Sequence, residues 1–172
     1  GADCTIAAIN VPKSDASRYG ILNTNEDGTI YEFEEKPKKP KSTLASMGIY
    51  IFDAKVLEEA LDNEFTDFGK EIIPQTLKKY KVNSYVYDGY WEDIGTIKSF
   101  YDATLDLTSI TPKFNFYDEE KPIYTHMRNL PPSKLNFANM NRSTASEGCV
   151  ITEATITDSV IGVRSIIEKN AQ

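Results

Sequence analysis

Three short stretches of the chain carry side chains that could bind a ligand or react with one. The first is Glu35-Lys36-Pro37, which ends a run of alternating apolar and polar residues. Proline disfavours helical backbone at the residue before it, so we expect Lys36 to be extended and its side chain to project in a fixed direction. Such a lysine can hold a phosphate while the neighbouring carboxylate takes sugar hydroxyls. A solvated strand end is the alternative, and the tripeptide alone favours it.

The second stretch, "LASMGIYIFD", places the small residues Ala45, Ser46 and Gly48 ahead of an apolar run. Small side chains let a ligand or another backbone segment approach closely, and Ser46 adds a hydroxyl group. Plain strand packing with a bulge at Gly48 explains the same pattern without a ligand. Taken alone, this stretch favours the packing explanation.

The third stretch, "GYWEDIGT", holds the only tryptophan and two neighbouring carboxylates, Glu92 and Asp93. We expect a strand to end near Tyr90, and open α/β sheets bind ligands beyond the carboxyl ends of their strands. Either carboxylate could coordinate Mg²⁺, which usually takes one or two protein carboxylates and leaves its other positions to water and phosphate. A cap for the following helix, from an aspartate or Thr96, is an equally good explanation.

The composition argues against several other classes of protein. The net charge of -7 disfavours a nucleic-acid partner held by charge. His126 is the only histidine, which excludes a metal site built from several histidines, and Cys4 and Cys149 share no motif, so we expect reduced thiols. No apolar run approaches the roughly 20 residues that span a bilayer. We expect no membrane association and, without a cleavable apolar leader, a cytoplasmic location. No glycine-rich phosphate loop is present, so the chain alone has no means of holding a nucleoside triphosphate.

Hydrophobic patterning predicts strands that alternate with helices, as in an α/β sheet. Strand patterns, the second of them a hairpin, cover residues 4–11, 19–37, 44–54 and 81–89. Helical patterns cover residues 54–61, 68–80 and 96–108. We expect Asp53 to cap the first helix and Pro74 to bend or interrupt the second.

The sequence pattern changes after residue 110, where the helical spacing of apolar residues ends. A proline-rich stretch predicts an extended connection, over residues 111–147. From Cys149 the chain can be cut every six residues, with apolar first positions and small fifth positions in the last two units. That pattern is typical of triangular coils in which the apolar first positions stack inward and the small fifth positions fit the corners. A single hairpin is the alternative. The predicted domains are therefore 1–110, 111–147 and 148–172.

In their order and spacing, these stretches together resemble the glucose-1-phosphate adenylyltransferases (ADP-glucose pyrophosphorylases). The resemblance covers essentially the whole chain. It is carried by "EFEEKP", "LASMGIYIFD", "DFGKEIIP", "YWEDIGTIKSFYDATLDL", "FNFYDEEKPIYT", "LPPSK" and the hexapeptide units. "EKP" and "W-x-D-x-G-T" are shared by sugar-phosphate nucleotidylyltransferases in general, whereas "LASMGIYIF" and "YDEEKPIYT…LPPSK" are more specific.

The resemblance implies a fold and an activity. The fold would be α/β: part of a Rossmann-like (GT-A-like) mixed sheet, followed by the first coils of a left-handed parallel β-helix. The full enzyme would make ADP-glucose and pyrophosphate from ATP and glucose 1-phosphate with Mg²⁺, and would be an allosteric homotetramer. The triphosphate-binding loop of this family lies upstream of residue 1, so we expect this chain to be inactive by itself.

The resemblance also implies roles for individual residues. Lys36 would hold the phosphate of the sugar and Glu35 its hydroxyls. Ser46 would add a sugar contact, with Gly48 and Tyr50 shaping the same wall. Asp93, rather than Glu92, would be a Mg²⁺ ligand.

Four alternatives are left open. The first is a nucleotidylyltransferase that uses a UDP-, dTDP- or GDP-sugar, because the base is read outside this chain. The second is a non-catalytic regulatory subunit, against which the intact Lys36, Ser46 and Asp93 argue. The third is a hexapeptide-repeat acyltransferase, which usually needs a histidine in its coils; residues 149–172 contain none. The fourth is an interaction scaffold built on the same fold.

Overall fold

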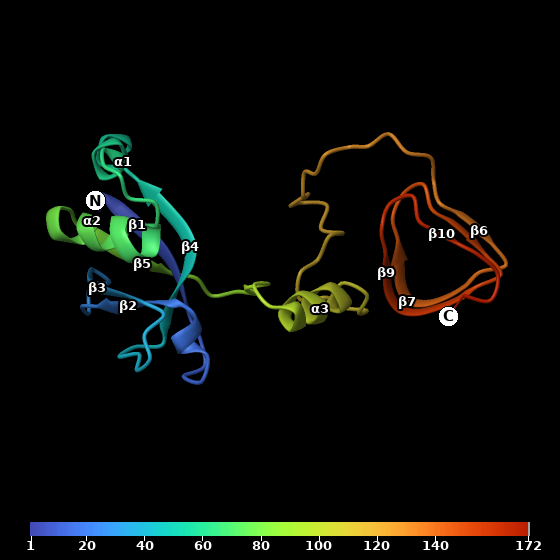
Figure 1. Ribbon diagram of the computed structural model, residues 1–172, viewed down its shortest axis with the longest axis horizontal. Helices are drawn as coiled ribbons and strands as arrows, with labels where there is room; N and C mark the ends of the chain where they lie inside the picture. Colours follow the sequence, from blue (N-terminus) through green and yellow to red (C-terminus); the bar gives the residue numbers. More distant parts are fainter. Residues whose placement is uncertain (172) are drawn as a thin grey trace. The chain divides into compact units, whose positions relative to one another are not determined.

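The computed structural model describes residues 1–171 and divides the chain into two compact units, Gly1–Gly89 and the part from Tyr90 onward (Figure 1). Each unit has its own hydrophobic core. No helix among the described residues is long and apolar enough to cross a membrane.

The first unit is built on a five-stranded mixed sheet with the strand order β3-β2-β4-β1-β5. The strands are β1 (Cys4–Asn10), β2 (Gly20–Thr24), β3 (Ile30–Glu35), β4 (Leu44–Phe52) and β5 (Val82–Val86). β1 pairs antiparallel with β4 and parallel with β5, and β2 pairs antiparallel with both β3 and β4. The predicted α/β class and the predicted hairpin over residues 19–37 are confirmed.

The hairpin turn forms where the sequence places its turn residues. Gly28 has a φ of +81°, which glycine adopts without steric cost. Its backbone N–H donates to the carbonyl of Asn25, and the carboxylate of Asp27 accepts from the N–H of Thr29. These local bonds fix the register of β2 against β3, and thereby place Glu35 opposite Gly20.

The helices of the first unit follow their capping residues. A 3₁₀ turn covers Ala16–Arg18, and α1 covers Ala54–Leu61 with Asp53 as its N-cap, as predicted. A π-helical turn, Phe68–Ile72, leads into α2, Ile73–Lys79. Pro74 lies in the first turn of α2, where its missing N–H has no partner to lose, so the helix is interrupted just ahead of the proline.

The core of the first unit lies where α2 meets the sheet. Ile73 of α2 is fully buried and packs with side chains from the sheet, among them Cys4, Ile6, Leu22 and Val82. β1 alternates buried and half-buried residues, and is therefore less completely covered than its apolar sequence predicts. This core supports β3 and β4, from which the candidate site is built.

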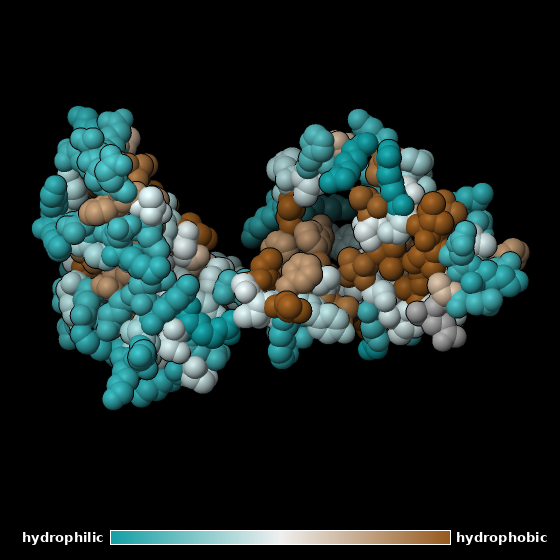
Figure 2. Space-filling view, viewed as in Figure 1, coloured by the Kyte–Doolittle hydropathy of each residue, from teal (hydrophilic) through white to brown (hydrophobic). Residues whose placement is uncertain are grey.

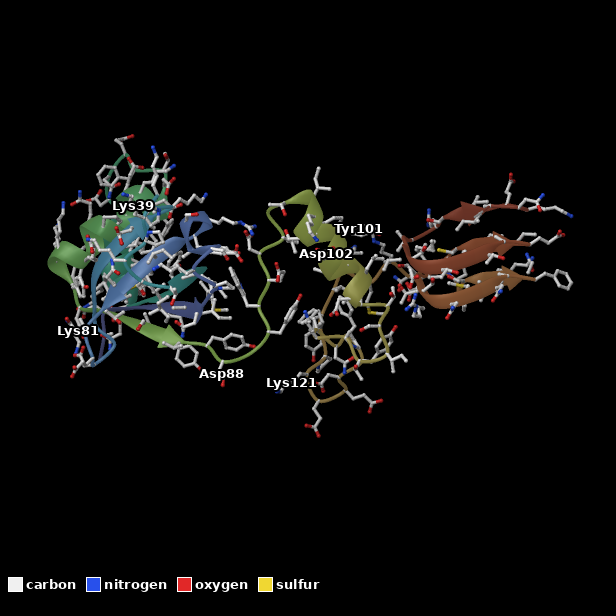
Figure 3. The ribbon with its side chains drawn as sticks, turned by 90° about the horizontal axis from the view of Figure 1, so that it is seen from below. Lys39, Lys81, Asp88, Tyr101, Asp102 and Lys121 are labelled. Carbon is white, nitrogen blue, oxygen red and sulfur yellow. The ribbon has the colours of Figure 1, made fainter. Side chains whose placement is uncertain are left out.

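The second unit begins with an irregular segment ahead of α3. The last strand before it, β5, ends at Val86 and not near Tyr90 as predicted. Its helix α3 covers Ile97–Asp106 and opens on a capping box between Thr96 and Ser99. Asp102, labelled in Figure 3, pairs with Lys98 one turn earlier on the same helix. An irregular connection then leads to Lys134, in line with the extended stretch that the prolines predict.

The chain then forms a triangular coil (Figure 1). Its strands are β6 (Lys134–Asn136), β7 (Asn139–Ala145), β8 (Val150–Thr152), β9 (Thr155–Ile161) and β10 (Ile166–Ile167), and all of their pairings are parallel. Arg142 and Asp158 have positive φ and bend β7 and β9, so that each of these strands supplies two sides of a turn. The expected parallel β-helix is therefore present, and a single hairpin is excluded.

The repeat of the coil differs from the one read in the sequence. Side chains that bond between successive turns, such as those of Asn136 and Thr152, are 16 residues apart, and not a multiple of six. The first positions Cys149, Ile161 and Ile167 pack in the core of the coil, whereas Thr155 is exposed and its neighbour Ile156 is buried. Pairing between turns also begins at Lys134, ahead of the predicted residue 148. The turn that contains β6 and β7 was missed because its sequence lacks the aliphatic pattern of the later units.

Candidate functional site

Lys36 has an unusual backbone conformation directly after β3. Its φ is +47°, so the prediction of an extended backbone is wrong. Its N–H donates to the carbonyl of Tyr19 over 3.1 Å, and this bond holds the turn. Non-glycine residues rarely adopt positive φ, and such strained residues cluster at functional sites. The turn leaves the side chain of Lys36 exposed at the end of the sheet.

The carboxylate of Glu35 lies beside this lysine and is more enclosed. Its side chain is 22% exposed, against 66% for Lys36, and 3.7 Å separates Glu35 Oε1 from Lys36 Nζ. The other oxygen, Oε2, lies against the backbone of Gly20 and Gly69. The end of β3 thus presents a partly buried anion next to an exposed cation.

Ser46 and Gly48 form a bulge in β4. Opposite β1 the register steps from Tyr50 to Ser46 while β1 advances only from Ile6 to Ala8. Gly48 has a φ of +73°, and its N–H donates to Ser46 Oγ over 3.2 Å. The bulge expected at Gly48 is therefore present, and bulges re-aim the side chains beside them. Ser46 itself is buried.

Tyr50 follows this bulge in β4 and interacts with Ser46 of the same strand and with Glu35 of β3. Its ring stacks on Phe68 with a centroid separation of 5.6 Å and an interplanar angle of 15°. Burial raises the pKa of the Tyr50 phenol, and the negative charge of Glu35 acts in the same direction, whereas a hydrogen bond with Ser46 lowers it. The phenol therefore stays neutral and able to donate. Tyr50 thus interacts with both Ser46 and Glu35, two of the residues predicted for the site.

The turn that opens the π-helix adds charged residues that sequence reasoning did not single out. Asp67 Oδ1 accepts from the N–H of Lys70 over 2.9 Å, and Lys70 Nζ lies 3.1 Å from Asp67 Oδ2. The hydrogen bond from the Lys70 backbone, more than any other contact, lowers the pKa of Asp67. An aspartate ahead of a helical run is an N-cap signature, so a capping search would have found this turn. This turn lies beside Glu35, as the close approach of Gly69 to the Glu35 carboxylate shows.

This cluster combines features that suit a phosphorylated polyol. Lys36 and Lys70 supply positive charge, and Ser46 and Tyr50 supply neutral hydroxyls. The carboxylate of Glu35 can accept hydrogen bonds from hydroxyl groups. A ligand with one anionic end and several hydroxyls would satisfy all of these groups at once.

Asp93 lies in the second unit, in the irregular segment ahead of α3. Its Oδ1 accepts from the N–H of Gly95 over 3.2 Å, and the side chain is half-buried. Thr96 caps α3, because its Oγ1 accepts from the N–H of Ser99 over 3.1 Å. The capping explanation for this stretch is thus answered by Thr96, and Asp93 serves no cap. Glu92 is exposed.

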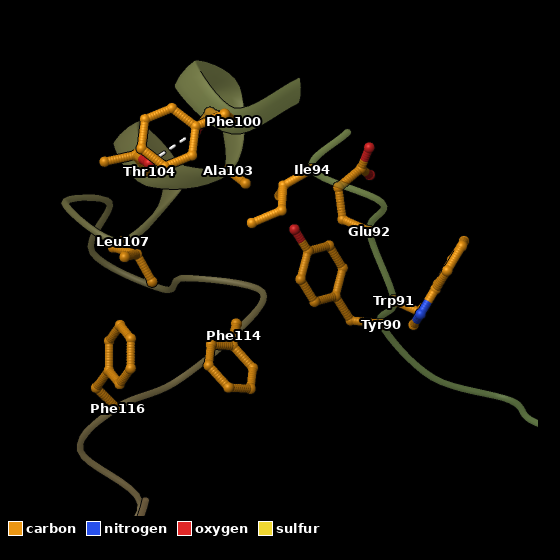
Figure 4. A pocket seen from close by; sticks show the side chains of 10 residues that line it. All are labelled: Tyr90, Trp91, Glu92, Ile94, Phe100, Ala103, Thr104, Leu107, Phe114 and Phe116. Atoms are coloured by element: carbon orange, nitrogen blue, oxygen red, sulfur yellow. Dashed lines mark hydrogen bonds between the residues drawn. The ribbon is translucent and has the colours of Figure 1, made fainter. Parts of the chain in front are cut away.

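A cavity of about 380 Å³ lies beside this segment, within the second unit (Figure 4). Apolar side chains gather on the visible face of this unit in Figure 2. The cavity is lined by Tyr90, Trp91, Glu92, Ile94, Phe100, Ala103, Thr104, Leu107, Phe114 and Phe116. Lys113 Nζ lies 5.8 Å from the centroid of the Tyr90 ring, within reach of a cation–π contact. Trp91 therefore lines a cavity, and the side chains around this cavity are mainly apolar.

Residues 1–171 contain no group of three or more histidine, cysteine or acidic side chains that could hold a metal ion. Asp93 is a half-buried carboxylate, and Mg²⁺ commonly takes only one or two protein carboxylates.

Comparison with known proteins agrees with this arrangement. Residues 1–110 match the model of the nucleotidyl transferase family, and residues 128–172 match that of the GLGC left-handed parallel beta-helix domain. A glucose-1-phosphate adenylyltransferase of Ruminiclostridium cellulolyticum is 48% identical over 98% of this chain and 41% of its own length. The protein of the same name from Acetivibrio thermocellus is 43% identical over 99% of this chain and 46% of its own length.

The chain thus spans less than half the length of these curated relatives. The nucleotidyl transferase match nevertheless covers most of the chain, including the mixed sheet and the segments that carry Glu35, Lys36 and Ser46. The chain therefore belongs to the nucleotidyl transferase family.

Proposed function

We propose that this chain is the sugar-phosphate-binding part of a glucose-1-phosphate adenylyltransferase, which forms ADP-glucose and pyrophosphate from ATP and glucose 1-phosphate for glycogen or starch synthesis. The observation that carries the proposal is the gathering of Glu35, Ser46 and Tyr50 beside Lys36 at the end of the sheet. The name of the two relatives, glucose-1-phosphate adenylyltransferase, supports glucose 1-phosphate as the acceptor and an adenylyl group as the group transferred.

The proposed roles follow from the chemistry of each group. Lys36 holds the phosphate of the substrate, because its ammonium is exposed and lies beside the carboxylate of Glu35. Glu35 accepts hydrogen bonds from the sugar hydroxyls, and Ser46 and Tyr50 shape the wall beside it, with Gly48 leaving open space. The attacking atom is a phosphate oxygen, which is already ionised, so no general base is needed. These residues act by holding and orienting the nucleophile.

We further propose that Asp93 contributes one carboxylate to a divalent metal site, with Mg²⁺ as the ion. When bound, Mg²⁺ neutralises charge on the phosphates during transfer. The remaining ligands would come from phosphates, water and residues outside this chain, since its described part holds no complete metal cluster. We also propose that the full-length enzyme is a homotetramer, that it is cytoplasmic and that it has no nucleic-acid partner.

A titration of the 172-residue chain with glucose 1-phosphate tests the binding role. We expect saturable binding, and we expect Lys36→Ala to weaken it about tenfold or more, because a charged hydrogen bond to phosphate is lost. Lys39→Ala is the matched control, since it removes a lysine from the same loop and should change the affinity less than about twofold. Equal losses in the two variants would contradict the role of Lys36.

Kinetics on a longer protein that contains this chain test the reaction itself. Asp93→Asn should lower kcat far more than it disturbs folding, whereas Lys36→Ala should chiefly raise the KM for glucose 1-phosphate. Unchanged kinetics in either variant would reject the role given to that residue.

A further inference from the structure

Gly69 lies directly against the carboxylate of Glu35. A Cβ atom on Gly69 would lie 2.5 Å from Glu35 Oε2, closer than Cβ atoms approach other atoms, and 3.1 Å from Glu35 Cδ, which is a tight contact. The described glycines with positive φ are Gly28, Gly48 and Gly148. The backbone conformation of Gly69 is therefore open to other residues, and what this position needs is the absence of a side chain.

A second glycine borders the same oxygen from the neighbouring strand. Gly20 of β2 pairs with Glu35 across the hairpin, and a Cβ atom on Gly20 would lie 2.4 Å from Cζ of Phe33 and 3.1 Å from Glu35 Oε2. The carboxylate thus lies in a slot bounded by Gly69 of the π-helical turn on one side and by Gly20, with the ring of Phe33 against it, on the other. Asp67 lies close by, with its Oδ1 3.6 Å from the Cβ position of Gly69.

We propose that this slot fixes the direction of the Glu35 carboxylate, and that Gly69 is a positioning residue for sugar-phosphate binding. The proposal rests on the proposed function, because it concerns the same ligand. A methyl group at position 69 would push the carboxylate out of the slot and misdirect its hydrogen bonds. It would leave β3 and the turn in place, because only the tip of a flexible side chain must move.

The expected signature separates this role from a structural one. Gly69 lies in a helical turn, where alanine is favoured over glycine, so Gly69→Ala should keep or raise the melting temperature. The same substitution should weaken binding of glucose 1-phosphate about tenfold, in proportion to the loss of one charged hydrogen bond. A variant that is at least as stable but binds more weakly is not explained by damaged folding.

A double-mutant cycle on the 172-residue chain tests whether the methyl group acts through Glu35. The affinity for glucose 1-phosphate is measured for wild type, Gly69→Ala, Glu35→Gln and the double variant. We expect Gly69→Ala to cost about tenfold in the wild-type background and less than about twofold beside Glu35→Gln, because coupled residues are not additive. Additive effects would overturn the proposal. Gly162→Ala, which places a methyl group in open space, is the control and should not change the affinity.

A measurement without ligand keeps the slot testable independently of the proposed function. The side-chain carboxyl carbon of Glu35 is followed by NMR in wild type and Gly69→Ala. We expect its chemical shift to change in Gly69→Ala and to stay constant in Gly162→Ala. An unchanged Glu35 signal in Gly69→Ala would overturn the slot. Wild-type chain that binds no glucose 1-phosphate would instead contradict the proposed function.

Discussion

The loop after Lys36 is tied back to the sheet by a second set of charges. Lys41 pairs with Glu32 of β3 over 2.7 Å. The buried amide of Asn23 donates to both Glu32 and Glu34, over 2.9 and 2.8 Å. The loop is therefore anchored at its start by the backbone bond of Lys36 and at its end by Lys41. Two anchors reduce the conformations from which Lys36 must be ordered when it binds a ligand.

Cys4 gives a prediction for the dependence of stability on pH. Burial raises the pKa of its thiol from 9.0 to about 11. The unfolded chain therefore loses this proton at lower pH than the folded chain does. Stability from the neutral thiol is fully present below about pH 9 and is lost as the pH rises through 11. We expect a loss of about 2 to 3 kcal/mol in the free energy of unfolding.

Urea unfolding of wild type and Cys4→Ala at pH 8 and pH 11 measures this effect. Other groups titrate equally in both proteins, so the difference between the two pH-dependent losses isolates Cys4. We expect wild type to lose more stability than Cys4→Ala over this range. Equal losses in the two proteins would show that Cys4 does not titrate as an enclosed thiol.

At the scale of elements, α3 depends on its cap, because none of its residues is buried. In the capping box the Oγ1 of Thr96 accepts from the N–H of Ser99, and Ser99 Oγ accepts from the N–H of Thr96. Thr96→Ala should destabilise the first turn by about 1 kcal/mol, and Thr96→Ser should not. Hydrogen exchange at the amide of Ser99 should then quicken about fivefold in Thr96→Ala alone. Equal exchange in the two variants would show that packing, not the cap, holds the helix.

Elements defined by local chemistry could be predicted from the sequence, and those defined by distant contacts could not. The hairpin turn at Gly28 and the cap at Asp53 follow from residues within a few positions of each other. The conformation of Lys36 depends on a bond to Tyr19, which lies in another segment. The length of each turn of the coil depends on pairing between residues 16 positions apart, so a six-residue pattern does not give the repeat.

The candidate site shows the same division between local and distant information. Ser46 and Gly48 were chosen because small residues let a ligand approach, and the bulge that the packing alternative predicts at Gly48 is present. The turn at Asp67 was missed, although its capping pattern is local, because its function depends on Gly69 meeting Glu35. Only the folded chain shows that contact, because Gly69 and Glu35 lie 34 positions apart in the sequence.

At the scale of the whole molecule, the chain has separate cores, and separate cores predict separate stabilities. Ile73 is fully buried in the core of the first unit, and Ile151 is fully buried in the coil of the second. Replacing either by alanine leaves a cavity and should cost about 2 to 5 kcal/mol. We expect each loss to stay within its own unit, because no residue belongs to both cores.

Native-state hydrogen exchange in wild type, Ile73→Ala and Ile151→Ala resolves the two cores. Amides of β1 report on the first unit and amides of β8 on the second. Ile151→Ala should reduce the protection of β8 and leave that of β1 unchanged, and Ile73→Ala should do the reverse. If either substitution lowers protection in both strands by the same free energy, the chain unfolds as one cooperative body. In that case the sugar-phosphate site in the sheet would depend for its stability on the coil, despite its separate core.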